Sequence, residues 1–192
     1  MNSALLVIDA QKIYTQEGLS LYCEDADVTL ANINALIEDF QKKNLPVIYI
    51  RHVHKKDGSD TGHMFNFAGP AEDFEFKQDS VEAEFSDGLI IDRNQKVITK
   101  NRYSSFVGTD LEEHLKQQKI DRVVISGYMT NFCCESAARD AHDRDYYVDF
   151  ILDATGTPGV EGFDQDETRK AVAAFLEAGF ATIHSTQDYL EQ

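Results

Sequence analysis

The fold is decided by residues 121–154, which read DRVVISGYMTNFCCESAARDAHDRDYYVDFILDA. The apolar run 122–126 predicts a buried strand, and Gly127 after it marks a turn. Residues 131–143 then predict a helix, and residues 147–152 predict another buried strand. Two buried strands joined by a helix lie parallel in one sheet, so this stretch predicts an α/β protein.

The same alternation of apolar runs and amphipathic stretches extends along the rest of the chain. Further strands are predicted at residues 4–8, 47–50, 97–99 and 180–183, and further helices at 27–43, 109–118 and 164–178. Repeated units of this kind predict one domain, residues 1–192, with a parallel sheet covered by helices on both faces. The long polar segment 51–88 interrupts the pattern, and segments of that length are typical of lids or binding loops.

Composition excludes several classes of partner. The chain has 192 residues, of which 18 are basic and 34 acidic, for a net charge of −16. This acidic excess argues against nucleic acid and anionic membrane surfaces as partners. No apolar run approaches the roughly 20 residues that cross a bilayer. The chain has three cysteines, two of them adjacent, which make no disulfide framework. No cationic leader precedes the first strand. We therefore expect a cytoplasmic protein.

Several polar or glycine residues follow the predicted strands directly. Asp9, Lys100, Gly127 and Asp153 come after four of them, and His52 comes shortly after a fifth. Ligands of open parallel sheets bind beyond the carboxyl ends of the strands. These residues are therefore predicted to share one edge of the sheet, where a site is expected.

Cys133 is the candidate nucleophile, because it falls in the first turn of the helix predicted at 131–143. Backbone N–H groups and the helix dipole favour an anion there. An ammonium group about 4 Å away, such as that of Lys100, stabilises a thiolate by about 4 kcal/mol at an effective dielectric constant of about 20. That energy lowers a thiol pKa from about 8.5 to about 5.5. A charged Asp9 nearby would cancel this effect, so Asp9 is predicted to accept the thiol proton.

The alternative interpretation is that Cys133 and Cys134 are small residues of the core, which is the commoner place for a free cysteine. The two side chains lie about 100° apart around a helix, so they do not face the same cleft. Spacing alone leaves the choice between these interpretations open.

Four segments resemble the isochorismatase-like cysteine hydrolases of the nicotinamidase/isochorismatase superfamily. The segments occur in the family order and span nearly the whole chain. They read LLVIDAQ (5–11), TKNRYSSF with GTDL (99–106 and 108–111), GYMTNFCCESAARDA (127–141) and DA (153–154). The resemblance implies a three-layer Rossmann-like fold with about six parallel strands in the order 3-2-1-4-5-6. It also implies a catalytic triad of Asp9, Lys100 and Cys133, and it selects Cys133 over Cys134.

The resemblance implies hydrolysis of an amide, ureido or imide C–N bond of a small-molecule substrate through a thioester. Backbone N–H groups of Met129 and Cys133 would form the oxyanion hole, next to a cis peptide bond between Met129 and Thr130. Family members that act on isochorismate lack the cysteine, so Cys133 argues against that substrate. No cofactor is implied, and family members form homodimers or larger assemblies.

Other residues are candidates for substrate binding. Gln11 and Tyr128 adjoin the triad in sequence and are the predicted substrate contacts. Further aromatic residues are weaker candidates, because aromatic side chains more often pack in the core: Tyr14, Phe65, Phe67, Tyr103 and Phe106.

Family nicotinamidases hold a metal through an Asp-x-His pair after the second strand and a later histidine. In this sequence the corresponding residues are His52 and His54, with His63 further along the chain. Because histidine replaces the aspartate, we predict that no metal is bound; His52, His54 and His63 are the residues that would form an altered site.

Three alternative functions remain open. The first is a metal-containing amidase of the nicotinamidase type. The second is an aspartate-based phosphatase, although such enzymes need a second aspartate where this chain has Gln11. The third is a non-catalytic binding or redox module that uses the adjacent Cys133 and Cys134, which leaves Asp9 and Lys100 unexplained.

Overall fold

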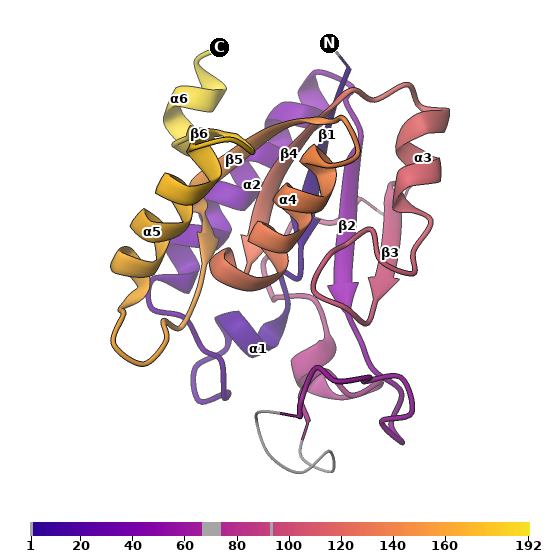
Figure 1. The fold of residues 1–192 in the computed structure, drawn as a ribbon, viewed down its shortest axis with the longest axis vertical. Coiled ribbons are helices and arrows are strands. Elements are labelled where there is room, and N and C mark those ends of the chain that lie inside the picture. Colours follow the sequence, from indigo (N-terminus) through magenta and orange to yellow (C-terminus); the bar gives the residue numbers. More distant parts are fainter. Residues whose placement is uncertain (1, 67–73, 93) are drawn as a thin grey trace.

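A computed structural model describes residues 2–66, 74–92 and 94–192, and it shows an α/β fold around one parallel sheet (Figure 1). Six strands lie in the order β3-β2-β1-β4-β5-β6. Their bounds are β1 Ser3–Ile8, β2 Val47–His52, β3 Lys96–Lys100, β4 Arg122–Tyr128, β5 Tyr147–Gly156 and β6 Thr182–His184. Every pairing between them is parallel. The predicted Rossmann-like architecture and the strand order 3-2-1-4-5-6 are confirmed.

Helices cover both faces of the sheet and give the molecule three layers (Figure 1). On one face lie α3 (Leu111–Gln117), α4 (Glu135–His142) and α5 (Gln165–Glu177). On the other lie α1 (Lys12–Thr15), α2 (Ala26–Lys42) and α6 (Thr186–Leu190). The central strand β1 is buried on both sides: Leu6 and Ile8 pack into the first layer, while Leu5 and Val7 pack into the second. Burial on both faces explains why this strand is an unbroken apolar run.

The strand register aligns the carboxyl ends of the central strands. Ile8 of β1 pairs with Ile50 of β2 on one side and with Gly127 of β4 on the other. His52 in turn pairs with Lys100, the last residue of β3. Residues that directly follow β1, β2, β3 and β4 therefore meet at one edge of the sheet, as predicted.

Gly127 is required by the close approach of β4 to β1. Its φ is +120°, and a Cβ atom placed on it would lie 1.8 Å from the carbonyl oxygen of Ile8. Only glycine fits this position, because no side chain tolerates that contact.

Several element boundaries differ from the predicted ones. β2 and β4 each run two residues further than expected, and β5 runs to Gly156. Asp153 therefore lies inside β5, not after it, and its carboxylate accepts hydrogen bonds from the N–H and hydroxyl of Thr186 at the start of α6. The prediction that Asp153 belongs to the site edge was wrong, because this carboxylate is used to hold α6.

The helix predicted at 131–143 has two parts. It begins with a π-helical turn, η3 (Thr130–Cys134), and continues as α4. Helices α1 and α6 were not predicted, because segments of four and five residues are too short to show a helical period.

The connection from β2 to β3 is joined to the rest of the molecule by backbone hydrogen bonds. It includes the 3₁₀ turn η2 (Val81–Ala83). The N–H of His54 donates to Phe76, and the N–H of Ser86 donates to Ala10. Its predicted function as a lid stays a prediction. Among the described residues, no helix is both long and apolar enough to cross a membrane.

Candidate active site

Three ionisable side chains meet in the interior at the carboxyl edge of the sheet. Asp9 follows β1 with a left-handed backbone (φ 48°), Lys100 ends β3, and Cys133 lies in η3. Their exposed fractions are 0%, 2% and 2%, so all three are shielded from solvent. The structure brings the three predicted triad residues together.

Lys100 lies between the other two groups. Its Nζ is 2.7 Å from Oδ2 of Asp9 and 3.2 Å from Sγ of Cys133. The same nitrogen donates to the backbone carbonyl of Arg102 at 3.0 Å. An ammonium group has three N–H bonds, so every hydrogen of Lys100 has an acceptor. These contacts hold Lys100 against both Asp9 and Cys133.

Burial, not the ammonium group, dominates the pKa of the nucleophile. Loss of solvent raises the pKa of the Cys133 thiol to about 12, although Lys100 acts to lower it and Asp9 acts to raise it. The expected pKa near 5.5 was wrong for the substrate-free protein, because that value included the attraction to Lys100 but not the cost of burying an anion. Cys133 is therefore a thiol at neutral pH.

Asp9 and Lys100 form a buried ion pair, and each of them shifts the pKa of the other. Burial raises the pKa of Asp9 above its ordinary value, against the opposing effect of Lys100. Burial alone would lower the pKa of Lys100, but Asp9 and Cys133 raise it. The arrangement therefore supplies a carboxylate that is a stronger base than usual, close to a thiol and to a fixed positive charge. Such a carboxylate is suited to accept the thiol proton when the thiol attacks a substrate.

Gln11 fastens three backbone segments around this site. Its Nε2 donates to the carbonyls of His52 and Ala83 at 3.0 and 2.9 Å, and its Oε1 accepts from the N–H of His52 at 2.7 Å. These bonds link the segment after β1 to the end of β2 and to η2. The amide of Gln11 thus has a structural function here, and its predicted contact with substrate stays a prediction.

Tyr128 faces the α2 side of the sheet, not the face that contains Cys133. It is fully buried, its ring stacks on Tyr14 with centroids 5.0 Å apart, and its hydroxyl donates to the carbonyl of Ala26. Tyr14 lies nearer the triad: burial raises the pKa of its hydroxyl well above the usual value, and Cys133 and Asp9 add to the effect. Of this pair, Tyr14 is the one whose hydroxyl interacts electrostatically with Cys133 and Asp9.

The other aromatic candidates lie in different surroundings. Phe106 packs in the core against Tyr146. Tyr103 is 38% exposed and packs against Phe132, next to the nucleophile in sequence. Phe65 contacts the ring of His54. Phe67 lies outside the described residues.

The cis peptide bond lies one residue earlier than predicted. It joins Tyr128 to Met129, not Met129 to Thr130. Thr130 is already the first residue of η3, so the turn between strand and helix is made before it, at Met129. The Thr130 hydroxyl donates to Thr155 at 2.9 Å, which links η3 to β5.

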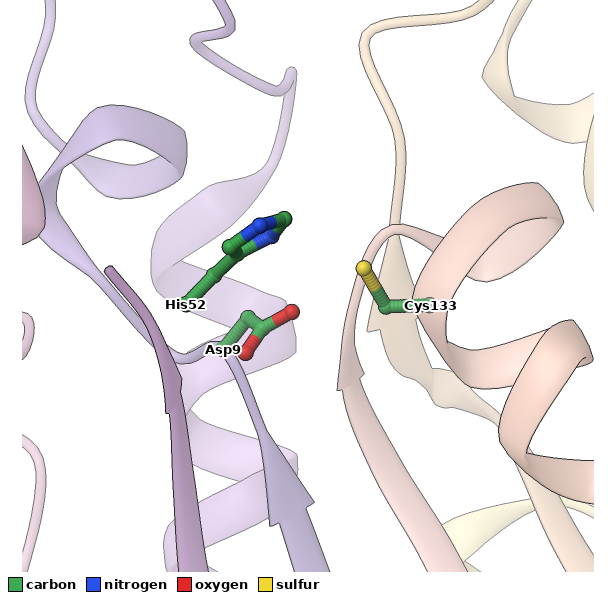
Figure 2. A group of neighbouring side chains, drawn as sticks. All are labelled: Asp9, His52 and Cys133. Carbon is green, nitrogen blue, oxygen red and sulfur yellow. The ribbon is translucent and has the colours of Figure 1, made fainter. Parts of the chain in front are cut away.

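The three histidines considered as metal ligands are not assembled. His52 and His54 are buried, with their Nε2 atoms 2.9 Å apart, whereas His63 is exposed and contacts Asn66. Among the described residues, the one group whose ligand atoms lie within 4.8 Å of one another is Asp9, His52 and Cys133 (Figure 2). The Lys100 ammonium lies 2.7 Å from its carboxylate and 3.2 Å from its sulfur, so a protein cation already occupies the position between these two ligands. Two protein ligands beside a fixed positive charge do not fit a resident metal at this group of described residues.

Several side chains that contact His52 and His54 were not predicted from the sequence. Phe76 stacks on the ring of His52 at 4.5 Å, and Phe74 contacts the edge of His54. Oδ1 of Asp60 lies 3.5 Å from Nδ1 of His54. These residues come from the irregular connection after β2, where no periodic pattern marks which side chains turn inward.

A buried thiol, ammonium and carboxylate therefore lie together at the carboxyl edge of a Rossmann-like sheet. The family model for the isochorismatase domain matches residues 3–188. The chain therefore belongs to the isochorismatase family of hydrolases, and the resemblance seen in the sequence is confirmed.

Individual relatives show the same relationship. The chain is 30% identical over 181 residues to Nicotinamidase 3 of Arabidopsis thaliana, covering 94% of this chain and 83% of the relative. It is 27% identical to the ureidoacrylate amidohydrolase RutB of Agrobacterium fabrum, covering 97% and 88%. Among solved structures, a cysteine hydrolase from Pseudomonas syringae pv. phaseolicola superposes with a TM-score of 0.91 at 25% identity, covering 99% of this chain and 91% of that one.

Proposed function

We propose that the protein hydrolyses a C–N bond of a small amide, ureido or imide compound through a thioester on Cys133. The observation that carries this proposal is the placement of one buried ammonium, Lys100, 3.2 Å from the Cys133 sulfur and 2.7 Å from the Asp9 carboxylate. The relatives that act on nicotinamide and ureidoacrylate support a substrate of this class.

In the first half-reaction Asp9 removes the proton of the Cys133 thiol as the sulfur attacks the substrate carbonyl carbon. Lys100 stabilises the developing thiolate, which burial otherwise disfavours. The tetrahedral intermediate collapses when the C–N bond breaks, and the protonated Asp9 returns its proton to the leaving nitrogen. The products are a thioester on Cys133 and a free amine or ammonia.

In the second half-reaction Asp9, again a carboxylate, takes a proton from water as the water oxygen attacks the thioester carbon. The C–S bond breaks, the sulfur recovers the proton from Asp9, and the carboxylic acid leaves. In both halves the carbonyl oxygen becomes an oxyanion, and we assign its stabilisation to the backbone N–H groups of Met129 and Cys133. Each such donor is worth about 3 kcal/mol in the transition state.

The alternative functions find less support. A phosphatase would use Asp9 as its nucleophile, but Asp9 is paired with Lys100 and the position two residues on is Gln11, whose amide is bonded to backbone. A redox pair of Cys133 and Cys134 would leave the buried ion pair without a purpose. Magnesium dependence of any activity would favour the phosphatase.

The test is a panel of small amides, ureido acids and imides, with isochorismate included, assayed for ammonia and acid release. We expect at least one compound with a C–N bond to be hydrolysed by the wild type. The Cys133→Ala variant should lose at least about 1000-fold in kcat/KM, since the covalent route is removed.

Cys134→Ala is the matched control, because Cys134 is equally buried in the same turn and burial raises the pKa of its thiol well above the usual value. It should retain activity within a few-fold of the wild type. Ammonia release that persists in Cys133→Ala, or equal losses in both variants, would reject covalent catalysis by Cys133.

A further inference from the structure

One buried ring nitrogen beside the proposed nucleophile, Nδ1 of His52, has no hydrogen-bond partner among the described residues. The Asp9 carboxylate next to it has the Lys100 ammonium at 2.7 Å and the Cys133 thiol as its donors, and a carboxylate has acceptor positions beyond these two. Lys100 has no hydrogen left for His52, since its three N–H bonds point to Asp9 Oδ2, Cys133 Sγ and the Arg102 carbonyl. A buried acceptor without a donor costs about 1–3 kcal/mol, so this nitrogen indicates a ligand that brings an N–H group.

The protonation of His52 follows from its neighbours. His52 Nε2 and His54 Nε2 are 2.9 Å apart, so one donates and the other accepts. On its other side, His54 Nδ1 faces the Asp60 carboxylate at 3.5 Å. A carboxylate favours a proton on the nitrogen that it faces, which places the His54 hydrogen on Nδ1 and leaves its Nε2 as an acceptor. His52 must then carry its hydrogen on Nε2, so its Nδ1 has only a lone pair.

The tautomers deduced for His52 and His54 require two neutral imidazoles and an ionised Asp60 carboxylate. Burial lowers the pKa of both histidines, with Lys100 and Arg102 adding to the effect, so both imidazoles are neutral at pH 7. Although burial acts to raise the pKa of Asp60, hydrogen bonds from Lys55 and Asn101 lower it, so Asp60 stays a carboxylate.

The imidazole of His52 lies beside the proposed base and nucleophile. One of its ring nitrogens is within 4.8 Å of an Asp9 carboxylate oxygen and of Cys133 Sγ, and the three side chains converge from β1, β2 and η3 (Figure 2). Stacking on Phe76 and the bond to His54 fix the ring plane.

We propose that Asp60 and His54 fix the tautomer of His52 so that its Nδ1 accepts a hydrogen bond from an N–H of the scissile amide. The second N–H of an unsubstituted amide or ureido nitrogen then reaches Oδ1 of Asp9, the group that later protonates that nitrogen. His52 is the substrate contact, and His54 and Asp60 are positioning residues. The site therefore selects an unsubstituted –NH₂ leaving group over an N-methylated one. This inference rests on the proposed hydrolysis for the identity of the ligand.

The first test needs no substrate. In protein with ¹⁵N-labelled histidine, NMR at pH 7 should show His52 protonated on Nε2 and His54 protonated on Nδ1. The Asp60→Asn variant should reduce the population of this tautomer pair, whereas Asp57→Asn, which alters a carboxylate of the same loop that accepts from Ser59, should leave it unchanged. A His52 ring that carries its proton mainly on Nδ1 in the wild type would overturn the proposal.

The second test probes the contact itself in the Cys133→Ala protein, which does not turn the probe over. Acetamide should shift the ¹⁵N signal of His52 Nδ1, and N,N-dimethylacetamide, which has no N–H, should not. Equal shifts from both probes, or no shift from either, would reject the substrate contact. These readouts do not depend on hydrolysis, so they stand apart from a failure of the thioester mechanism.

Kinetics with the best substrate of the panel completes the set. His52→Phe keeps the ring stacked on Phe76 but removes the acceptor, and we expect a loss of about 10- to 100-fold in kcat/KM, the worth of one buried hydrogen bond. His52→Gln, which restores a carbonyl acceptor, should recover part of that loss, and His63→Gln at the surface should have no effect. Equal activity of His52→Phe and the wild type would contradict the inference.

Discussion

Lys100 is a buried charge that contacts both Asp9 and Cys133. We therefore expect the stability of the fold and the reactivity of the Cys133 thiol to depend on it. Its ammonium and the Asp9 carboxylate are both removed from water, and each is tolerated only because the other is there. The fixed ammonium also opposes the effect of burial on Cys133. In the proposed mechanism, Lys100 therefore balances the charge of the base, Asp9, and assists the nucleophile, Cys133.

Lys100→Met should lower the free energy of unfolding by about 3–5 kcal/mol, because it leaves the Asp9 carboxylate buried without a partner. The double variant Asp9→Asn/Lys100→Met should recover most of that loss, since it removes both charges. Lys96→Met on the same strand breaks a partly exposed ion pair with Asp110 and should cost less than about 1 kcal/mol. Urea denaturation measures all three, and similar losses in the Lys100 and Lys96 variants would contradict the argument.

The thiol of Cys133 should react slowly with iodoacetamide at pH 7, because its pKa is raised to about 12 and little thiolate is present. Below that pKa the rate should rise about tenfold per pH unit. Asp9→Asn removes a charge that raises the pKa, so it should react faster than the wild type at pH 8; Lys100→Met should react more slowly. Mass spectrometry of modified Cys133 gives the rates. A wild-type rate that levels off below pH 7 would show that the thiol is ionised in the free protein.

At the scale of the elements, the side chains of the proposed triad lie at the end of β3, directly after β1 and in the turn η3 after β4. The apolar runs predicted five of the six strands to within two residues at each end, and the ends of those strands placed Asp9 and Lys100 correctly. β5 was longer than predicted, because its extension 153–156 mixes polar and small residues that are buried only by their neighbours. For that reason Asp153 was predicted to follow the strand, although it lies within it.

The turn after β4 is the element most sensitive to substitution. Gly127→Ala would place a methyl group 1.8 Å from the Ile8 carbonyl in a left-handed backbone, so we expect a loss larger than the usual 0.5–3 kcal/mol in the free energy of unfolding. Gly179→Ala is the control, because a Cβ there meets no atom within 4 Å, and its effect should stay within about 1 kcal/mol. Comparable denaturation midpoints for the two variants would contradict the role given to Gly127.

At the scale of the whole molecule, the described part of the connection between β2 and β3 supplies the surroundings of the histidines. Phe74, Phe76 and Asp60 contact His52 or His54 from this connection. Sequence motifs predicted the triad residues but not these partners. The homodimer or larger assembly, the single-domain organisation and the cytoplasmic location stay predictions.

Metal analysis tests the interpretation of this region. Protein purified without added metal should contain zinc and manganese well below one ion per chain, because His63 lies apart from the His52–His54 pair and Asp9 is paired with Lys100. Elemental analysis by mass spectrometry measures the content, and His52→Ala provides the background value. Stoichiometric metal that disappears in His52→Ala would favour the amidase of the nicotinamidase type.

The sequence by itself determined the order of the six strands and of the longer helices, and the sheet edge at which Asp9, Lys100 and Cys133 meet. These follow from local periodicity and from motifs that short segments carry. Only the tertiary structure decided the protonation of Cys133, the position of the cis peptide bond and the partners of His52. Those properties depend on desolvation and on contacts between segments far apart in the chain, and neither is encoded in any one stretch of residues.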